Sequence, residues 1–215
     1  MTAPLNISRR TFIKATALVV GGLVIAFNIP NAKRFLLPGA APDKSGADAA
    51  KLPAPNAFLR IGTDNTITVM LAHSEMGQSI WTTLPMLIAE ELDADWSKIK
   101  VEHAKAAPEY IHTAYGIQIT GGSSTTWSEF DRYRQAGALT RALLVAAAAA
   151  ELGVSADSLR TENGFVISGD KKISYGELAE AAAKLETPKA VTLKQPQDWK
   201  IIGKATKRLD GPEKI

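Results

Sequence analysis

The stretch between residues 58 and 103 constrains the fold most, because its apolar spacing changes from a strand period to a helix period and back. Residues 58–61 and 66–71 predict two short strands joined by a turn. A polar loop with one glycine follows, then a helix over about 82–92 and a strand over 99–103. The result is a strand–loop–helix–strand unit, whose crossover is right-handed if its two strands pair in parallel.

The second half of the chain predicts one more long helix and a hairpin. Ser128, with Asp131, is expected to cap a helix that runs to about Leu152 and stops at Gly153. Residues 159–174 read as a hairpin, and Ser174–Glu177 forms a capping box that opens a last helix to about Leu185. The expected fold class is α/β: a small mixed sheet with two main packed helices, over residues 58–188.

The N-terminal segment resembles a twin-arginine export signal. Arg9 and Arg10 precede an uncharged, mostly apolar stretch over 15–29, which is shorter than a membrane-spanning helix usually needs. No clean small-x-small cleavage site follows, so residues 1–35 are expected to be a signal or an uncleaved N-terminal anchor. An ordinary buried or membrane-anchoring helix is the alternative. The resemblance implies a periplasmic protein, exported folded and often with its cofactor, with possible anchoring to the inner membrane.

Composition narrows the classes of function. The net charge is +3, but five basic residues lie before the first acidic one, and the remainder carries −2, which argues against nucleic acid as a partner. The chain has no cysteine, which excludes disulfides, thiolate zinc sites and iron–sulfur clusters within it. Residues 36–57 read as a Pro/Ala-rich linker and 189–215 as a tail with little to pack against.

Two loops could carry chemistry. The first, around Gly77, Gln78 and Ser79, lies between a strand and a helix N-terminus, where backbone amides favour anionic ligands. The second is a Gly/Ser run that leads to the next long helix, and its amides and hydroxyls could cup a phosphate: Gly121, Gly122, Ser123, Ser124 and Thr125. Taken alone, each loop is more often a tight turn or a flexible connection.

In their order and spacing these segments resemble the molybdopterin-binding domain of molybdenum hydroxylases, the xanthine dehydrogenase and aldehyde oxidoreductase family. The resemblance is greatest to the isoquinoline 1-oxidoreductase beta subunit and the periplasmic aldehyde dehydrogenases. It lies in Glu75-Met76-Gly77-Gln78, Ala89-Glu90-Glu91-Leu92, Ile99-Lys100-Val101-Glu102 and Thr120-Gly121-Gly122-Ser123-Ser124-Thr125. It extends into the tail, which looks like the lead-in to the family's α/β hammerhead domain, outside these 215 residues.

The resemblance implies a molybdopterin cofactor shared with further domains or a partner chain. The Gly77–Gln78 loop would touch the pterin, and the Gly121–Thr125 loop would line its pyrophosphate or nucleotide end. The family usually has glycine where this chain has Ser79. Its catalytic glutamate, which deprotonates a molybdenum-bound hydroxyl group, has no match here, and Glu75 is expected to position its loop or to be solvated rather than to act as the base.

Other candidate residues fit less well. His73, His103 and His112 match no local metal-ligand spacing, and His103 is expected to be partly buried on the strand face of Ile99. Trp127 could flank a cofactor or substrate entrance. Ser123 or Ser124 as a hydrolase nucleophile would need a strained elbow and a paired histidine, and neither is visible.

The sequence therefore predicts the N-terminal fragment or split piece of a molybdenum hydroxylase catalytic subunit. Such enzymes hydroxylate aldehydes or N-heteroaromatics with water-derived oxygen and pass electrons to an iron–sulfur small subunit. The expected partners are the remainder of the molybdopterin subunit and that small subunit. The alternatives are a non-catalytic, membrane-tethered binding or assembly module of the same fold and, less well matched in length, a solute-binding protein.

Overall fold

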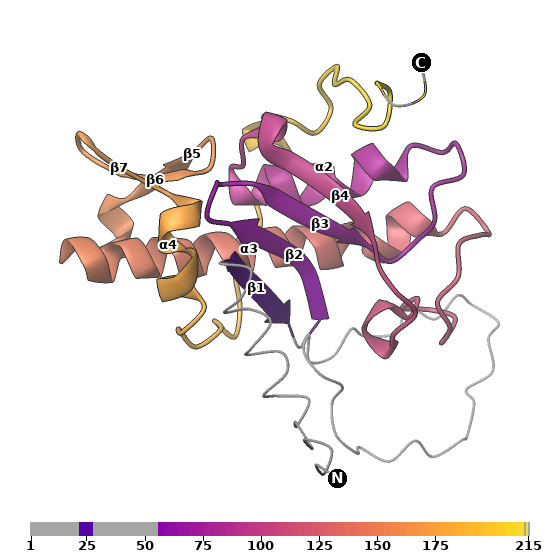
Figure 1. The fold of residues 1–215 in the computed structure, drawn as a ribbon, viewed down its shortest axis with the longest axis horizontal. Coiled ribbons are helices and arrows are strands. Elements are labelled where there is room, and N and C mark those ends of the chain that lie inside the picture. Colours follow the sequence, from indigo (N-terminus) through magenta and orange to yellow (C-terminus); the bar gives the residue numbers. More distant parts are fainter. Residues whose placement is uncertain (1–21, 28–55, 213, 215) are drawn as a thin grey trace, which may run out of the picture.

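The computed structural model describes residues 22–27, 56–212 and 214, which form two small sheets and three α-helices (Figure 1). Arg9, Arg10 and most of the expected linker lie outside the described residues. Among the residues that are described, no helix is both long enough and apolar enough to cross a membrane.

The larger sheet is mixed, with strand order β1-β2-β3-β4. Strands β2 (Asn56–Gly62) and β3 (Ile67–Leu71) form the expected antiparallel hairpin, and β3 pairs in parallel with β4 (Ile99–His103). The α/β prediction is therefore confirmed. One strand was not expected: β1 (Gly22–Phe27) pairs antiparallel with β2 and comes from the segment interpreted as a signal or anchor.

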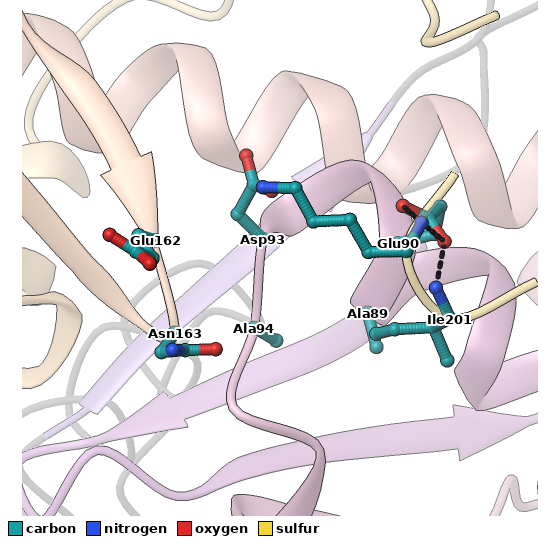
Figure 2. Close-up of a pocket in the computed structure, with 8 residues that line it drawn as sticks. Ala89, Glu90, Asp93, Ala94, Glu162, Asn163 and Ile201 are labelled. Atoms are coloured by element: carbon teal, nitrogen blue, oxygen red, sulfur yellow. Dashed lines mark hydrogen bonds and ion pairs between the residues drawn. The ribbon is translucent and has the colours of Figure 1, made fainter. Parts of the chain in front are cut away.

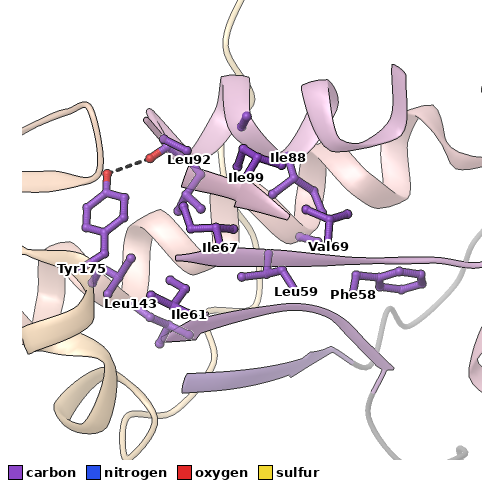
Figure 3. Packing of buried hydrophobic residues seen from close by; sticks show 14 of the residues in the cluster. Phe58, Leu59, Ile61, Ile67, Val69, Ile88, Leu92, Ile99, Leu143 and Tyr175 are labelled. Carbon is purple, nitrogen blue, oxygen red and sulfur yellow. Dashed lines mark hydrogen bonds between the residues drawn. The ribbon is translucent and has the colours of Figure 1, made fainter. Parts of the chain in front are cut away.

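Helix α2 (Ile80–Leu92) is the crossover between β3 and β4 and packs against α3 (Thr125–Leu152), which runs behind the sheet in Figure 1. The close approach of the two helices depends on Gly137, where a Cβ atom would lie 2.6 Å from the carbonyl oxygen of Ile88. The core between sheet and helices is built from aliphatic side chains, as Figure 3 shows for Ile67, Val69 and Ile88, together with a few buried aromatic rings.

The start of α3 corrects one prediction. The helix begins at Thr125, because Gly122 and Ser123 turn through left-handed conformations (φ 60° and 52°) and place Ser124 at the N-cap. Ser128 is inside the helix, and its hydroxyl donates to the carbonyl of Thr125 instead of capping. The predicted end is right: Gly153 adopts φ 66° and its amide bonds to Ala149.

The expected hairpin is a three-stranded meander, β5 (Arg160–Glu162), β6 (Phe165–Ser168) and β7 (Lys171–Ser174). The additional turn lies at Asn163–Gly164, both with positive φ. The capping box is confirmed: Ser174 and Glu177 exchange bonds at the start of α4 (Tyr175–Ala182), which ends three residues earlier than expected. Tyr175 ties α4 to α2 by donating to the carbonyl oxygen of Leu92 at 2.7 Å (Figure 3).

The tail is not loosely attached, which corrects the expectation that it has little to pack against. The backbone amides of Lys200, Ile201 and Ile202 donate to the buried carboxylate of Glu90 at 2.7–3.0 Å. The amide of Lys194 donates to Glu91, the next residue of α2. Buried carboxylates keep their charge only when hydrogen bonds replace water, so these amides fix the tail on α2.

Candidate functional site

The fold brings the two predicted loops together. The first, residues 74–79, follows β3 and leads into α2, and the second, residues 120–124, leads into α3. The amide of Ser74 donates to the hydroxyl of Thr120 at 2.8 Å, and the side chain of Gln118 donates to the carbonyl of Ala72 at 3.2 Å. Two segments 46 residues apart in sequence thus share one edge of the domain, at the carboxyl end of β3.

Glu75 organises the first loop. Its carboxylate is 8% exposed and accepts hydrogen bonds from the amides of Gly77 (2.7 Å), Ser79 (3.1 Å) and Trp81 (3.1 Å). Burial raises the pKa of Glu75, but the three amides outweigh it and hold that pKa below the ordinary value. The carboxylate therefore shapes the loop, as expected.

The side chain of Gln78 is also engaged within the loop. Its oxygen accepts from the amide of Met76 at 2.6 Å, and its amide group donates to the carbonyl of Ser74 at 2.9 Å. Gly77, at φ 102°, has open space where a side chain would be. Ser79 adopts φ 71° at the N-cap of α2, a left-handed conformation in which glycine is the unstrained residue. The loop thus presents Gly77 to open space, while the side chains of Glu75 and Gln78 hold its shape.

The second loop ends at an α-helix whose first turn lacks a side-chain cap. The hydroxyl of Ser124 accepts from none of the first-turn amides and donates to the carbonyl of Gly121 at 2.7 Å. A Cβ atom on Gly121 would meet nothing within 4 Å. Uncapped amides at the positive end of a 28-residue helix, beside open space, suit the negative charge of a phosphate group. These residues therefore fit the anionic end of a nucleotide or pterin cofactor.

A buried ionic cluster lies beneath both loops. The carboxylate of Glu129, on the second turn of α3, is 0% exposed and contacts Nε2 of His73 and Nη1 of Arg132, both at 3.2 Å. Arg132 also donates to the carbonyl oxygens of Ile111 and Glu109, at 3.2 and 2.9 Å. One helix turn thereby anchors the start of the first loop and the segment that leads to the second.

The three histidines do not form a metal site among the described residues, where no group of His, Asp and Glu is arranged to hold a metal. His73 and His112 are buried with ring centroids 5.7 Å apart. The expectation for His103 is wrong: it is exposed, and its Nε2 accepts from the indole of Trp81 at 2.9 Å. Trp127 is 51% exposed next to His112, and its place beside a cofactor or substrate entrance stays a prediction.

The contact that the sequence did not reveal is between His112 and the second loop, where no histidine paired with Ser123 or Ser124 was expected. Nε2 of His112 lies 2.9 Å from the hydroxyl of Ser124, 12 residues away. No short-range motif joins the two residues, and the contact depends on the path of the intervening loop. Burial lowers the pKa of His112 below that of an ordinary histidine.

A cavity of about 150 Å³ lies at the opposite end of α2, away from both loops (Figure 2). Its charged lining includes Glu90, Asp93 and Lys200. Figure 2 shows Glu90 bonded to the amide of Ile201, and Asp93 accepts from both Lys194 and Lys200, so these charges are already paired. The cavity belongs to the docking of the tail and is not the candidate site.

Comparison with known families identifies the domain. A family model described as "Molybdopterin cofactor-binding domain" matches residues 36–213. The chain belongs to this family. Molybdopterin as the cofactor of the family, which the sequence predicted, is thereby confirmed.

Two curated relatives of this chain carry the names of oxidising enzymes. The chain is 33% identical to "Membrane-bound aldehyde dehydrogenase [pyrroloquinoline-quinone]" of Gluconacetobacter polyoxogenes over 97% of this chain and 26% of the relative. It is 30% identical to "Isoquinoline 1-oxidoreductase subunit beta" of Brevundimonas diminuta, over 82% and 28%. Among solved structures it is similar to the CO dehydrogenase of Oligotropha carboxidovorans, with a TM-score of 0.46 and 24% identity over 57% of this chain and 15% of that one. The chain thus spans about a quarter of the length of the two curated relatives.

Proposed function

We propose that this chain contributes part of the molybdopterin cradle of a molybdenum hydroxylase that oxidises aldehydes or N-heteroaromatic compounds. The observation that carries the proposal is the junction of the two loops at Ser74 and Thr120, beside the uncapped end of α3. Family membership supplies the cofactor, and the open space at Gly77 and Gly121 supplies room for it.

In this proposal the residues of the chain bind and orient. The Gly77–Ser79 loop, fixed by Glu75, borders the pterin, and residues 121–125 with the first-turn amides of α3 hold the phosphate end. When bound, the cofactor supplies the molybdenum centre for oxygen transfer and electron uptake. The general base would come from the remainder of the catalytic subunit, and an iron–sulfur subunit would take the electrons.

The test is a cofactor assay on the complex isolated from its native host with a tag on this chain. The proposal expects molybdenum and pterin in the complex, together with polypeptides that account for the rest of the subunit. A complex with neither molybdenum nor pterin would instead favour the non-catalytic assembly module. Pyrroloquinoline quinone, which appears in one relative's name, is assayed in the same sample, and its presence alone would move the proposal to a quinone enzyme.

Gly121→Leu separates cofactor binding from folding. Position 121 has open space and no positive φ, so the larger side chain should leave the fold intact while it fills the proposed cradle. The matched control is Ala150→Leu, on the exposed face near the far end of α3. We expect cofactor content to fall at least tenfold in Gly121→Leu and to stay at the wild-type level in the control. Equal cofactor content in both would exclude this loop from the cradle.

We further propose that Arg9 and Arg10 direct export by the twin-arginine route to the periplasm, with residues 1–35 retained as an anchor or removed. The spacing of the arginines before an apolar stretch supports this, as does the membrane-bound relative. Either outcome for the whole segment would take β1 out of the sheet, since β1 is residues 22–27. Changing both arginines to lysine keeps the charge and should retain the chain in the cytoplasm. Undiminished export of the double variant, measured by fractionation, would contradict the proposal.

A further inference from the structure

His112 is the one buried histidine that contacts the second loop in the described part of the chain. It is 1% exposed and lies between the rings of Tyr115, stacked at 4.3 Å, and Trp127, edge-on at 5.6 Å. Its two ring nitrogens have separate partners: the amide of Ala114 lies 3.0 Å from Nδ1, and the hydroxyl of Ser124 lies 2.9 Å from Nε2. The two contacts join His112 to both Ala114 and Ser124, so they help to fix the path of the loop between these residues.

These partners determine where the ring proton lies. A backbone amide can only donate, so Nδ1 of His112 accepts from Ala114 and carries no proton. The proton of the neutral ring is then on Nε2 and points at the oxygen of Ser124. The hydroxyl of Ser124 in turn donates to the carbonyl of Gly121 at 2.7 Å, which completes a directed chain from His112 through Ser124 to Gly121.

The surroundings keep the ring neutral. Burial is the main cause that lowers the pKa of His112, and neighbouring His73 and Arg132 act in the same direction. Glu129 opposes them, but its carboxylate is already paired with Arg132 and in contact with His73. A second ring proton would also face the amide hydrogen of Ala114. The neutral ring is therefore the state that satisfies every contact around it.

The chain of bonds explains why α3 has no side-chain cap. A serine at an N-cap normally adopts an extended backbone and accepts from a first-turn amide. Ser124 instead has a helical backbone (φ −99°, ψ −20°), and its hydroxyl is placed to accept from His112 and to donate to Gly121 rather than to accept from a first-turn amide. The helix end that ought to be capped by its own serine is thereby left available to a ligand.

We propose that His112 is a positioning residue that withholds Ser124 from the helix N-terminus and so reserves the first-turn amides of α3 for the phosphate end of the cofactor. The role in ligand binding rests on the proposed function, whereas the bond chain itself does not. Without His112, residue 124 is free to take the capping conformation, in which its hydroxyl competes with the anion.

The first test reads the bond chain in the full-length protein without any cofactor. Histidine ¹⁵N spectra are expected to show His112 at pH 7 as the neutral form with its proton on Nε2. The amides of Gly121 and Ser124 should shift with the same midpoint as the ring when the pH is lowered. His103→Ala is the control: it removes an exposed histidine, and the pH-dependent shifts of those two amides should persist in it. A proton on Nδ1, or loop amides that ignore the titration of His112, would overturn the proposal.

The second test compares variants. In His112→Ala, amide exchange at Ser124 should accelerate about tenfold, since one hydrogen bond is worth about that factor. His112→Gln places an amide donor near the position of Nε2 and should restore most of the protection, and His103→Ala should change nothing. Should His112→Ala fail to fold, the glutamine variant and the titration still decide. Unchanged protection in a folded His112→Ala, or no recovery with glutamine, contradicts the proposal.

Inorganic pyrophosphate tests the ligand role, followed through the amides of Thr126 and Trp127. The proposal expects pyrophosphate to bind about tenfold more weakly to His112→Ala than to the wild type, and nearly normally to His112→Gln. Equal binding by all three proteins would show that His112 shapes the loop but does not reserve the amides, which overturns the proposal. No binding even by the wild type would count against the proposed function at this loop, whatever the first test shows.

Discussion

The two ends of α2 are built from the same chemistry over different distances along the chain. At the N-terminal end, Glu75 accepts amides from residues within six positions of itself. At the C-terminal end, Glu90 and Glu91 accept amides from a tail 103 to 112 residues further on. Both ends use a buried carboxylate as a hub, but the first hub shapes a loop beside open space, whereas the second holds a distant segment of the chain. Glu75 also lies 3.6 Å from Arg208 of the tail, yet its amide partners are all local, and the loop that they shape leaves room for a ligand.

The largest effect is expected from Glu90→Ala. The change leaves three tail amides without their acceptor. It also removes the more distant of two carboxylates near Lys194, which lies 3.6 Å from Glu90 and 2.7 Å from Asp93. Removing one member of such a buried set costs about 3–5 kcal/mol. Chemical denaturation should show this loss in the free energy of unfolding, and amide exchange should show that residues 200–202 become unprotected.

Glu151→Ala is the matched control, because Glu151 is an exposed glutamate on the last turn of α3. Its effect should stay within about 0.5 kcal/mol. A Glu90 variant as stable as this control would mean that the tail is held by other contacts.

A smaller loss is expected from Glu75→Gln, which removes the charge of the local hub but keeps its shape. Hydrogen bonds to a charged acceptor contribute about 1.5–3 kcal/mol, so the loss should fall in that range. Amide exchange should accelerate at Gly77 and Ser79 but not at residues 194–202, which dock on the other end of α2. Residues 208–210 are left out of this readout, because Arg208 lies 3.6 Å from the carboxylate of Glu75. Faster exchange at residues 194–202 would mean that the two ends of α2 are not independent.

Acid should weaken both ends together. The pKa values of Glu75 and Asp93 lie below their ordinary values: burial raises each, but amide donors at Glu75, and Lys194 with Thr161 at Asp93, outweigh it. A carboxylate with a lowered folded-state pKa contributes stability above its unfolded value, here near 4, and loses it as the pH falls through the folded value. Thermal unfolding between pH 6 and 3 should therefore show a falling midpoint, less steep in Glu75→Gln. Equal slopes in both proteins would show that Glu75 does not contribute to the loss of stability in acid.

Residues close together in the sequence allowed most helices and strands to be predicted, whereas contacts between residues far apart in the sequence could not be predicted. The capping box at Ser174 and the stop at Gly153 could be predicted because the residues involved are neighbours in sequence. The turn at Asn163–Gly164 could have been predicted too, since this dipeptide is a strong hairpin signal. Ser128 was misplaced as a cap because Ser124 has the same chemistry four residues earlier.

The candidate site also has features that the sequence predicts and features that depend on distant contacts. Both glycine loops were predicted from their position between elements, and Glu75 from its place in the first loop. The bond between Ser74 and Thr120 and the bond between His112 and Ser124 were not predicted, because each depends on how a long loop returns to the sheet. The docking of the tail on Glu90 depends on more than 100 intervening residues, and no spacing rule covers that distance.

The smallest effect is expected from Ser79→Gly, which tests the strain at the ligand end of α2. Ser79 has φ 71°. In this conformation the strain of a residue with a side chain costs about 1–2 kcal/mol, whereas the lost backbone entropy of a glycine costs about 0.5–1 kcal/mol. The variant should therefore be more stable by about 0.5–1 kcal/mol. Ser74→Gly is the control, since Ser74 lies in the same loop without a positive φ and should lose stability instead. Denaturation of both variants measures the difference, and a loss in both would mean that the loop is relaxed with serine at position 79.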